Sequence, residues 1–434
     1  MRATDRQIVI TGYGAISALG NDVDSLWRSL LEARSGVAPI SAFPTGDFRP
    51  NYAAEAREFS PEALDLAPRK LKLMGRHAQF ALAAAREAGR TARLIGGEPF
   101  YPPSRLGVVL GTGMLNADVA DLGRAFAATA QERRGEKMRF DLAAFSRYGV
   151  PQLFPLWLLR HIPNMTSAHA SIALNLQGPA NTIMNGCVAS LAAIGEARRL
   201  IARGEASAVF AGGTDARISP LALLRYRDLG WLATRDDVPP IAVSAPFDAH
   251  AAGFVCGEGA GALLLEDEEA ARQRNAPIRA AIIGYGAANE AGDPLHPSPE
   301  GRALARAITI CLRRSGLAPD EIDAIFAPAI SVPDFDRATA CALSTVFARC
   351  RPFVTATRSL LGHAHAASGA FDLIAAVKAL EAGQLPPTIN LERPIADFAF
   401  VTEGARAARL DHVLIAGYGF GGHAAALILR RVDR

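Results

Sequence analysis

The 434-residue sequence predicts a layered α/β protein built from two similar halves. Two observations lead to this expectation. Short apolar runs that end in glycine-rich turns alternate with alanine-rich amphipathic stretches, which is typical of strands and helices around a largely parallel sheet. The same series of segments then recurs in the same order later in the chain, which indicates a duplication.

The first half provides the elements of one such series. A strand is predicted at Ile8–Ala15, followed by helices at Asp24–Ala33 and Leu71–Gly89. A strand at Arg105–Gly113, a helix that begins at Ser190 and a strand at Ala208–Ala216 complete it. Each strand-like run is short and apolar and ends at glycine, whereas the helical stretches are amphipathic.

Four segments of the first half have counterparts in the second. They pair as Ile8–Ala15 with Ala281–Ala288, Arg105–Gly113 with Ile322–Ser331, Asn185–Ala206 with Gly362–Gln384, and Ala208–Ala216 with Val413–Gly422. Any one pair is unremarkable, but an ordered set of four implies two similar units. The boundaries predicted from the pairs are residues 1–266 and 278–434, joined by the polar stretch Asp267–Pro277.

Composition excludes several classes of protein. Lys plus Arg is 46 and Asp plus Glu is 43, so the net charge of +3 gives no general basis for binding nucleic acid or a membrane. The five cysteines include no CxxC pair and are odd in number, which suits a reducing compartment. Neither a signal peptide nor an apolar run long enough to span a membrane is visible, so a soluble cytoplasmic protein is predicted.

Cys187 is the first candidate for chemistry. It follows a strand-like segment and precedes a helix of small residues, in the sequence MNGCVAS. A helix N-terminus offers free N–H groups and a partial positive charge, which favour the thiolate form of a cysteine. The small neighbours Gly186 and Ala189 leave room for a substrate. The alternative is a buried structural cysteine.

His363 is the second candidate. It lies in LLGHAHAASGA, the segment that mirrors the Cys187 loop, and a twofold arrangement of the halves would place the two loops face to face. The alternatives are a turn histidine or a metal site formed by His363 and His365. No further ligand spacing supports a metal site, and none is predicted.

The glycines Gly417, Gly419 and Gly422 match an isolated GxGxxG pattern. This is a weak signal for a dinucleotide because too little chain follows for a complete βαβ unit. A turn whose backbone N–H groups stabilise an oxyanion fits the position better. No cofactor is therefore predicted, and a nucleotide-dependent oxidoreductase is the least favoured function.

At this level of detail the chain resembles the elongating β-ketoacyl-acyl carrier protein synthases of the thiolase superfamily. The motifs that carry the resemblance are VITGYGAIS, NMTSAHASIALNLQGPANT, GGTDA, APFDAHAAGFVCGEGAGALLLE, LLGHAHAASGA, PPTINLE and GYGFGGHAA. The resemblance implies a thiolase-like fold of five layers made of two duplicated α/β halves, usually as a dimer. It also implies an acyltransferase or condensing enzyme that works with acyl carrier protein.

Residue roles follow from the same resemblance. Cys187 would accept an acyl chain as a thioester, and His363 would be the second of two active-site histidines. Phe420 would be the gate beside the acyl pocket, and its backbone N–H and that of Cys187 would form the oxyanion hole. The basic residues Arg69, Lys70, Lys72 and Arg76 align with a region that docks the acidic carrier protein, although they also suit a solvated helix face.

Several positions depart from the family pattern. Pro328 stands where the first histidine is expected, and Ile330 and Val332 replace hydroxyl residues, whereas Asp336 is retained. Proline has no hydrogen-bond donor, and an oxyanion donor is typically worth ~10²–10³ in rate, so decarboxylation should be impaired. Arg358 and Asp372 replace a lysine and a glutamate that usually pair, and we expect them to form an ion pair.

Two functions remain open on these grounds. The first is a noncanonical β-ketoacyl synthase-like acyltransferase of fatty-acid or polyketide-type biosynthesis, in which Cys187 takes an acyl chain from a carrier protein. The second is a non-condensing partner subunit, similar to a chain-length factor, that pairs with an active ketosynthase. Retention of Cys187 favours the first, and loss of a histidine favours the second. The assembly would accordingly be a homodimer or a heterodimer with a second ketosynthase-like subunit.

Overall fold

A computed structural model describes residues 6–96, 99–113, 119–131 and 140–432, and its centre is one large sheet. Eleven strands form the sheet in the order β12-β10-β9-β14-β15-β8-β1-β7-β6-β4-β5. The first half contributes β1 (Ile8–Ile16), β4 (Leu106–Thr112), β5 (Ala180–Ile183), β6 (Ala208–Ala216) and β7 (Glu258–Asp267). The second half contributes β8 (Ala280–Asn289), β9 (Ala324–Phe326), β10 (Phe353–Thr355), β12 (Ala399–Phe400), β14 (His412–Gly419) and β15 (His423–Arg431).

The order of strands reveals the duplication. From the middle of the sheet outward, β1, β7, β6, β4 and β5 correspond to β8, β15, β14, β9 and β10. The two series meet where β1 pairs with β8 over Ile8–Ile10 and Ala280–Ile282. The duplicated α/β fold predicted from the repeated segments is therefore present. The domain boundaries at 266 and 278 stay a prediction.

The sheet is mixed, and the expectation of a largely parallel sheet was wrong. The outer strands of each half pair in parallel. The six strands in the middle of the sheet pair antiparallel, in the order β6, β7, β1, β8, β15 and β14. In the second half the reason is local. β14 and β15 are joined by the tight turn 420–422, and a connection this short can link only antiparallel strands.

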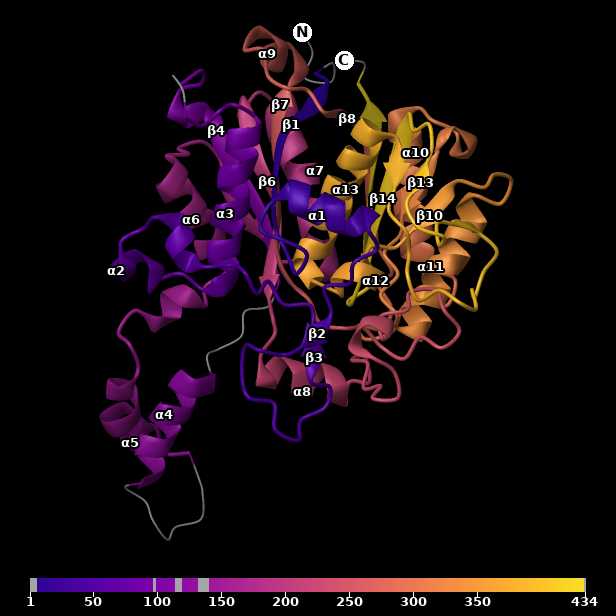
Figure 1. Cartoon of the computed structure of the whole chain (residues 1–434). Coiled ribbons are helices and arrows are strands. Elements are labelled where there is room, and N and C mark those ends of the chain that lie inside the picture. Colours follow the sequence, from indigo (N-terminus) through magenta and orange to yellow (C-terminus); the bar gives the residue numbers. More distant parts are fainter. Residues whose placement is uncertain (1–5, 97–98, 114–118, 132–139, 433–434) are drawn as a thin grey trace.

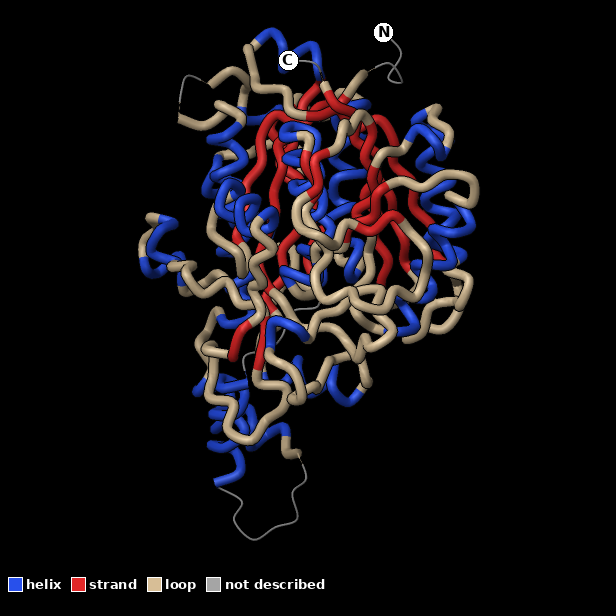
Figure 2. The backbone as a smooth tube through the Cα atoms, turned by 45° about the vertical axis from the view of Figure 1, so that its right-hand side comes forward, coloured by secondary structure: helices blue, strands red, loops and turns tan. Residues whose placement is uncertain are grey.

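Helices lie between and outside the two groups of strands, as Figures 1 and 2 show. The central layer is α7 (Ala189–Ala202) and α13 (Ser368–Ala382), whose apolar side chains share one core with strands of both halves. The outer helices are α3 (Arg76–Thr91) and α6 (Met165–Leu174) on the first half, and α10 (Arg302–Ser315) and α11 (Pro333–Val346) on the second. The central helices, the two groups of strands and the outer helices on each side are the five layers of the predicted fold.

Smaller elements complete the chain. They are α1 (Val23–Leu31), α2 (Pro68–Leu71), α4 (Val119–Gln131), α5 (Leu142–Ala144), α8 (Pro220–Asp228), α9 (Glu268–Gln273), α12 (Arg358–Leu361), and the short strands β2 (Ala38–Pro39), β3 (Tyr52–Ala53), β11 (Gln384–Leu385) and β13 (Arg406–Ala407). The helix predicted at Leu71–Gly89 begins later, at Arg76, because Gly75 is extended, with ψ 156°, and separates α2 from α3.

The repeated Gly-Tyr-Gly sequence has a steric cause. A Cβ added to Gly14 of β1 would lie 2.1 Å from the carbonyl oxygen of Ala84 in α3. A Cβ added to Gly286 of β8 would lie 2.0 Å from the carbonyl oxygen of Ala307 in α10. In both halves glycine therefore allows an outer helix to rest directly on the strand backbone. The two halves share this sequence because each makes the same close contact between a helix and a strand.

The close contact predicts the effect of one added methyl group. In Gly286→Ala the new methyl would push α10 away from β8, and we expect the free energy of unfolding to fall by about 1–3 kcal/mol. Urea denaturation would measure the change. Gly123→Ala is the matched control because Gly123 is exposed in α4 and an added Cβ meets nothing within 4 Å. A Gly286→Ala protein as stable as this control would contradict the packing argument.

Candidate functional site

Cys187 lies between the end of β5 and the start of α7. A single 3-10 turn, Gly186–Val188, leads from the strand into the helix, and Gly186 adopts a φ of +54° that suits glycine. Cys187 is 7% exposed. The backbone of the β14–β15 turn packs against it, because a Cβ on Gly419 would lie 2.8 Å from the Cβ of Cys187. The cysteine is thus fixed at a helix N-terminus, as expected.

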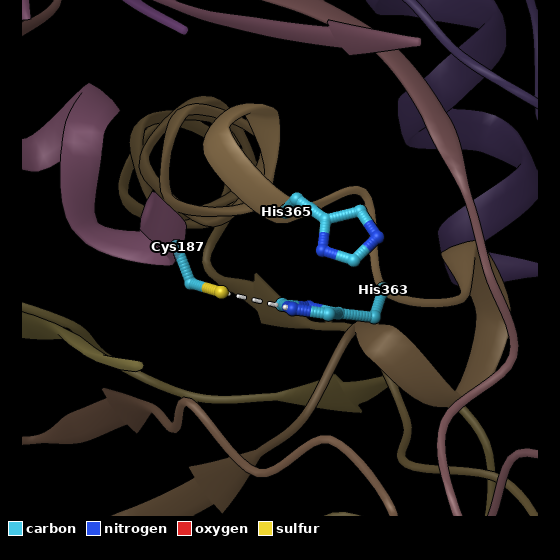
Figure 3. A group of neighbouring side chains, drawn as sticks. All are labelled: Cys187, His363 and His365. Carbon is cyan, nitrogen blue, oxygen red and sulfur yellow. Dashed lines mark hydrogen bonds between the residues drawn. The ribbon is translucent and has the colours of Figure 1, made fainter. Parts of the chain in front are cut away.

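His363 approaches Cys187 from the second half. Gly362, with a φ of +62°, ends α12, and the next residue bonds through its backbone to Val255 and Gly257. This pairing holds the imidazole so that its Nε2 lies 3.1 Å from the Sγ of Cys187 (Figure 3). The other ring nitrogen, Nδ1, lies 3.4 Å from the hydroxyl of Ser368. The loops that precede α7 and α13 therefore bring the two predicted side chains into contact.

Burial keeps both groups neutral. It raises the pKa of Cys187 to about 11, although the positive charge of Arg217 acts in the opposite direction. Burial also holds the pKa of His363 well below its ordinary value, with Arg358 and Arg217 adding to this effect. Burial therefore opposes the thiolate form that a helix N-terminus favours. At rest the pair is a thiol and a neutral imidazole.

Phe420 serves the site through its backbone and its ring. Its backbone N–H donates a hydrogen bond to the sulfur of Cys187, so this N–H points to the place where a reacting carbonyl would lie. Its ring stacks on Trp231, with centroids 3.8 Å apart and planes 13° from parallel. It also packs edge-to-face against the ring of Phe335, with ring centroids 5.0 Å apart. Trp231, which lies just after α8, was not indicated by any sequence pattern.

The glycine pattern does not form a nucleotide site. Gly417 and Gly419 lie in β14, and Gly422 lies in the turn into β15, which returns antiparallel along β14. A dinucleotide fingerprint needs a helix N-terminus after the strand, and here a strand follows instead.

The loop that carries Pro328 is buried and bound from two sides. Asp336 accepts hydrogen bonds from the backbone N–H groups of Phe247, Ile330 and Ser331 at 2.8–3.1 Å. The Nη1 of Arg358 donates to the carbonyl oxygen of Ala327 at 3.0 Å. The side chains of Ile330 and Val332 are buried and apolar. The retained aspartate thus holds the loop in place, although the loop offers no imidazole.

Arg358 and Asp372 form a buried ion pair, with side chains 5% and 0% exposed. The hydroxyl of Thr357 donates to the same carboxylate at 2.5 Å. Because Arg358 also binds the carbonyl of Ala327, the pair connects α13, the His363 segment and the Pro328 loop. A buried pair with these additional hydrogen bonds fixes geometry more than it adds net stability.

The four basic residues predicted to dock a carrier protein are all exposed, and one of them also forms an ion pair. Arg69, Lys70 and Lys72 are exposed on and just after α2, at the periphery of the molecule (Figure 1). Arg76 also pairs with the buried Glu258 at 2.7 Å and donates to the carbonyl of Ala56. Arg76 therefore ties α3 to the body of the protein, which the sequence did not indicate.

A third side chain lies at the centre of the site. His365 is buried beside Cys187 and His363, and the three possible metal-ligand atoms lie within 4.8 Å of one another. In the described part of the chain, these three residues form a group that could hold a metal ion through one sulfur and two nitrogen ligands. Sequence spacing suggested the two histidines but could not supply Cys187 as a third ligand. Cys187 would have to lose its thiol proton to bind a metal.

The fold and this centre define a class of protein: a duplicated α/β chain with a buried cysteine facing a histidine from the opposite half. Residues 5–271 match the family described as Beta-ketoacyl synthase, N-terminal domain, and residues 279–392 match Beta-ketoacyl synthase, C-terminal domain. The chain therefore belongs to the β-ketoacyl synthase family.

Individual relatives agree with this assignment over the full length. The chain is 35% identical to 3-oxoacyl-[acyl-carrier-protein] synthase 2 of Coxiella burnetii, covering 98% of this chain and 99% of that protein. It is 34% identical to the actinorhodin polyketide putative beta-ketoacyl synthase 1 of Streptomyces coelicolor, covering 99% and 89%. The solved structure of the ishigamide ketosynthase/chain length factor superposes with a TM-score of 0.85 at 30% identity, covering 99% and 100%.

Among the residues that the structure describes, no helix combines the length and apolar character needed to cross a membrane.

The neutral state of the site predicts the pH dependence of alkylation. Well below a thiol pKa, the thiolate fraction rises about tenfold per pH unit, so alkylation of Cys187 by iodoacetamide should rise about tenfold per unit from about pH 7 to about pH 9. Peptide mass spectrometry would follow Cys187 separately from the exposed Cys341. A rate for Cys187 that is already constant across this interval would show a preformed thiolate and contradict the neutral pair.

Proposed function

We propose that this chain is a β-ketoacyl synthase-type acyltransferase in which Cys187 accepts an acyl chain from a carrier protein. The observation that supports it most strongly is the 3.1 Å contact between the Sγ of Cys187 and the Nε2 of His363. A thiol that faces a neutral imidazole can be activated during attack, because the imidazole removes the proton as the sulfur becomes a nucleophile.

The proposed reaction is a transthioesterification. The Nδ1 proton of His363 is directed to the hydroxyl of Ser368, which leaves Nε2 with the lone pair that takes the thiol proton. The sulfur of Cys187 then bonds to the carbonyl carbon of the acyl-carrier thioester. The oxyanion forms between the backbone N–H groups of Cys187 and Phe420. When the intermediate collapses, the carrier sulfur leaves with the proton from His363, so the products are acyl-Cys187 and free carrier thiol.

The exposed cations Arg69, Lys70 and Lys72 support a carrier-protein docking site on α2. Their charges would attract an acidic partner, and this attraction would weaken in salt. A structural neighbour with a TM-score of 0.83 and 25% identity is described as a type II polyketide acyl-carrier protein in complex with its ketosynthase. Arg76 belongs to the same proposed surface, because its side chain stays 42% exposed while it pairs with Glu258.

A second ketosynthase-like subunit is proposed at the edge of the sheet that ends in β5. This strand lies at the edge of the sheet, and Ala180 and Asn181 are exposed. Nearby, Ile172 of α6 is 71% exposed and Met184 is 50% exposed. Unpaired strand edges beside apolar side chains are typical of surfaces that another chain covers. The occupant would be a copy of this chain or a related subunit.

A second function is favoured by one specific observation. The Pro328 loop supplies no side-chain donor to the site, and the ishigamide structure to which the chain is similar pairs a ketosynthase with a chain length factor. This chain would then shape the pocket of an active partner and accept no acyl group itself.

Acyl loading distinguishes these functions. We expect the intact mass of the protein to rise by one acyl group after incubation with acyl-carrier thioesters of several chain lengths. Cys187→Ala should gain no mass, because the nucleophile is absent. Cys341→Ala is the matched control, since Cys341 is exposed and distant from the chemistry, and it should load as the wild type does. No mass gain in a folded wild-type sample, or a gain that depends on Cys341, would overturn the proposal and favour the partner-subunit function.

A further inference from the structure

His365 is a buried imidazole to which the proposed acyl transfer gives no role. It begins the 3-10 turn His365–Ala367 that leads into α13, and it is 1% exposed. Its ring centroid lies 4.5 Å from that of His363. Figure 3 shows that the Nδ1 edge of the ring faces the space beside the sulfur of Cys187 and the ring of His363. One of its nitrogens lies within 4.8 Å of the reactive atoms of both residues.

The backbone holds His365 in an unfavourable conformation. Its φ is +47°, in the left-handed region that glycine and asparagine adopt readily and that strains other residues. Burial of a polar ring adds a further cost unless its nitrogens are used. An apolar side chain could fill the same space without that cost. The imidazole is therefore better explained by its nitrogen atoms than by its volume.

Neighbouring side chains fix the plane of the ring. Tyr226 stacks on His365 with centroids 4.9 Å apart and planes 18° from parallel, and Phe254 meets it edge-on at 5.3 Å. Tyr226 is held in turn by a hydrogen bond from Arg217, which pairs with Asp215 at 2.9 Å. These contacts leave the ring little freedom to turn.

The two ring nitrogens have different surroundings. Nε2 lies 3.8 Å from the sulfur of Cys256, on the side away from the nucleophile. Nδ1 lies on the edge of the ring that faces Cys187 and His363 (Figure 3). The thiol of Cys256 has two acceptors within reach, this Nε2 and the carbonyl oxygen of Gly257. In the tautomer that the proposal uses, the thiol donates to Nε2, so the imidazole proton lies on Nδ1 and points toward Cys187 and His363. A fixed donor is then aimed at the reacting centre.

The loop that carries Pro328 offers no imidazole. Pro328 has no N–H, the side chains of Ala329, Ile330 and Val332 are apolar, and the hydroxyl oxygen of Ser331 accepts a hydrogen bond from the backbone N–H of Ala245. A substrate that develops negative charge on an oxygen beside Cys187 would find a side-chain donor in His365.

We propose that His365 is a catalytic residue for carbon–carbon bond formation, in which its Nδ1–H donates a hydrogen bond to the thioester oxygen of a carrier-bound malonyl group as it loses carbon dioxide. This inference rests on the proposed acyl transfer and extends it to the second substrate. The bond between the malonyl carboxylate and the α-carbon breaks, and its electron pair forms an enolate whose oxygen is stabilised by this donor.

The remaining steps balance the reaction. The enolate carbon attacks the carbonyl carbon of acyl-Cys187, and the new oxyanion forms at the backbone N–H groups of Cys187 and Phe420. Collapse expels the sulfur of Cys187, which takes a proton delivered from solvent through His363. The products are carbon dioxide, the 3-oxoacyl carrier thioester and the free thiol.

Release of carbon dioxide from a malonyl-carrier thioester tests the proposal, because it can be measured in the presence or absence of a loaded acyl chain. His365→Gly suits the test, since glycine accepts the positive φ and removes the ring. We expect release to fall about 10²–10³-fold, the usual effect of removing one oxyanion donor. Added imidazole should restore part of the rate by occupying the vacated space. His365→Asn, which keeps an N–H donor and accepts the same φ, should be intermediate.

Acyl loading separates a catalytic role from a positioning role. His365→Gly should still gain an acyl group on Cys187, because that step uses His363. Equal losses of loading and of carbon dioxide release, without rescue by imidazole, would show that His365 only positions its neighbours and would overturn the proposal. Release at the wild-type rate in His365→Gly, or no release by the wild type, would overturn it as well.

Two further results distinguish the proposals from one another. A wild-type protein that takes no acyl chain but releases carbon dioxide in a His365-dependent manner would refute the proposed function and support the role of His365. One equivalent of zinc bound by the isolated wild type and lost in His365→Gly would make His365 a metal ligand and overturn its role as a donor.

Discussion

The close crossing of α7 and α13 between the two halves is the contact on which the site depends. At this crossing the first turns of both helices pack with almost no space between them. A Cβ on Gly369 would lie 2.7 Å from the hydroxyl of Ser190, and a Cβ on Gly213 would lie 2.3 Å from the carbonyl oxygen of Ala366. Small residues are therefore required where the helices begin, and the loops that precede them meet. Cys187 comes from one loop, and His363 and His365 come from the other.

This arrangement also determines the electrostatics. Helices and sheets of both halves enclose the loops, so water is largely excluded and burial becomes the largest influence on the pKa values of Cys187 and His363. Two charged pairs beside the loops are compensated, namely Arg358 with Asp372 and Arg217 with Asp215. The reactants at rest are neutral, and charge develops only when a thioester is present. Hydrogen-bond donors that are already oriented are most effective in such a setting.

The sequence predicted the fold and the central pair because both depend on repeated local patterns. Four ordered segments revealed the duplication, and the mirrored loops placed Cys187 opposite His363. Features set by tertiary contacts were less accessible. The direction of the Cys187 pKa shift depends on burial, the availability of Arg76 depends on Glu258 in a distant strand, and the stacking of Phe420 on Trp231 joins segments far apart in the chain. His365 was visible as a neighbour of His363, but its position beside Cys187 emerges only when the halves are assembled.

A crystal structure of the protein after loading with an acyl-carrier thioester would test the central claim most directly. The account predicts a thioester on the Sγ of Cys187, with its carbonyl oxygen about 2.7–3.1 Å from the backbone N–H groups of Cys187 and Phe420. The Nε2 of His363 should remain beside the sulfur. An acyl chain attached to another residue, or a carbonyl oxygen directed away from both N–H groups, would contradict the claim that these two loops form an acyl-transfer centre.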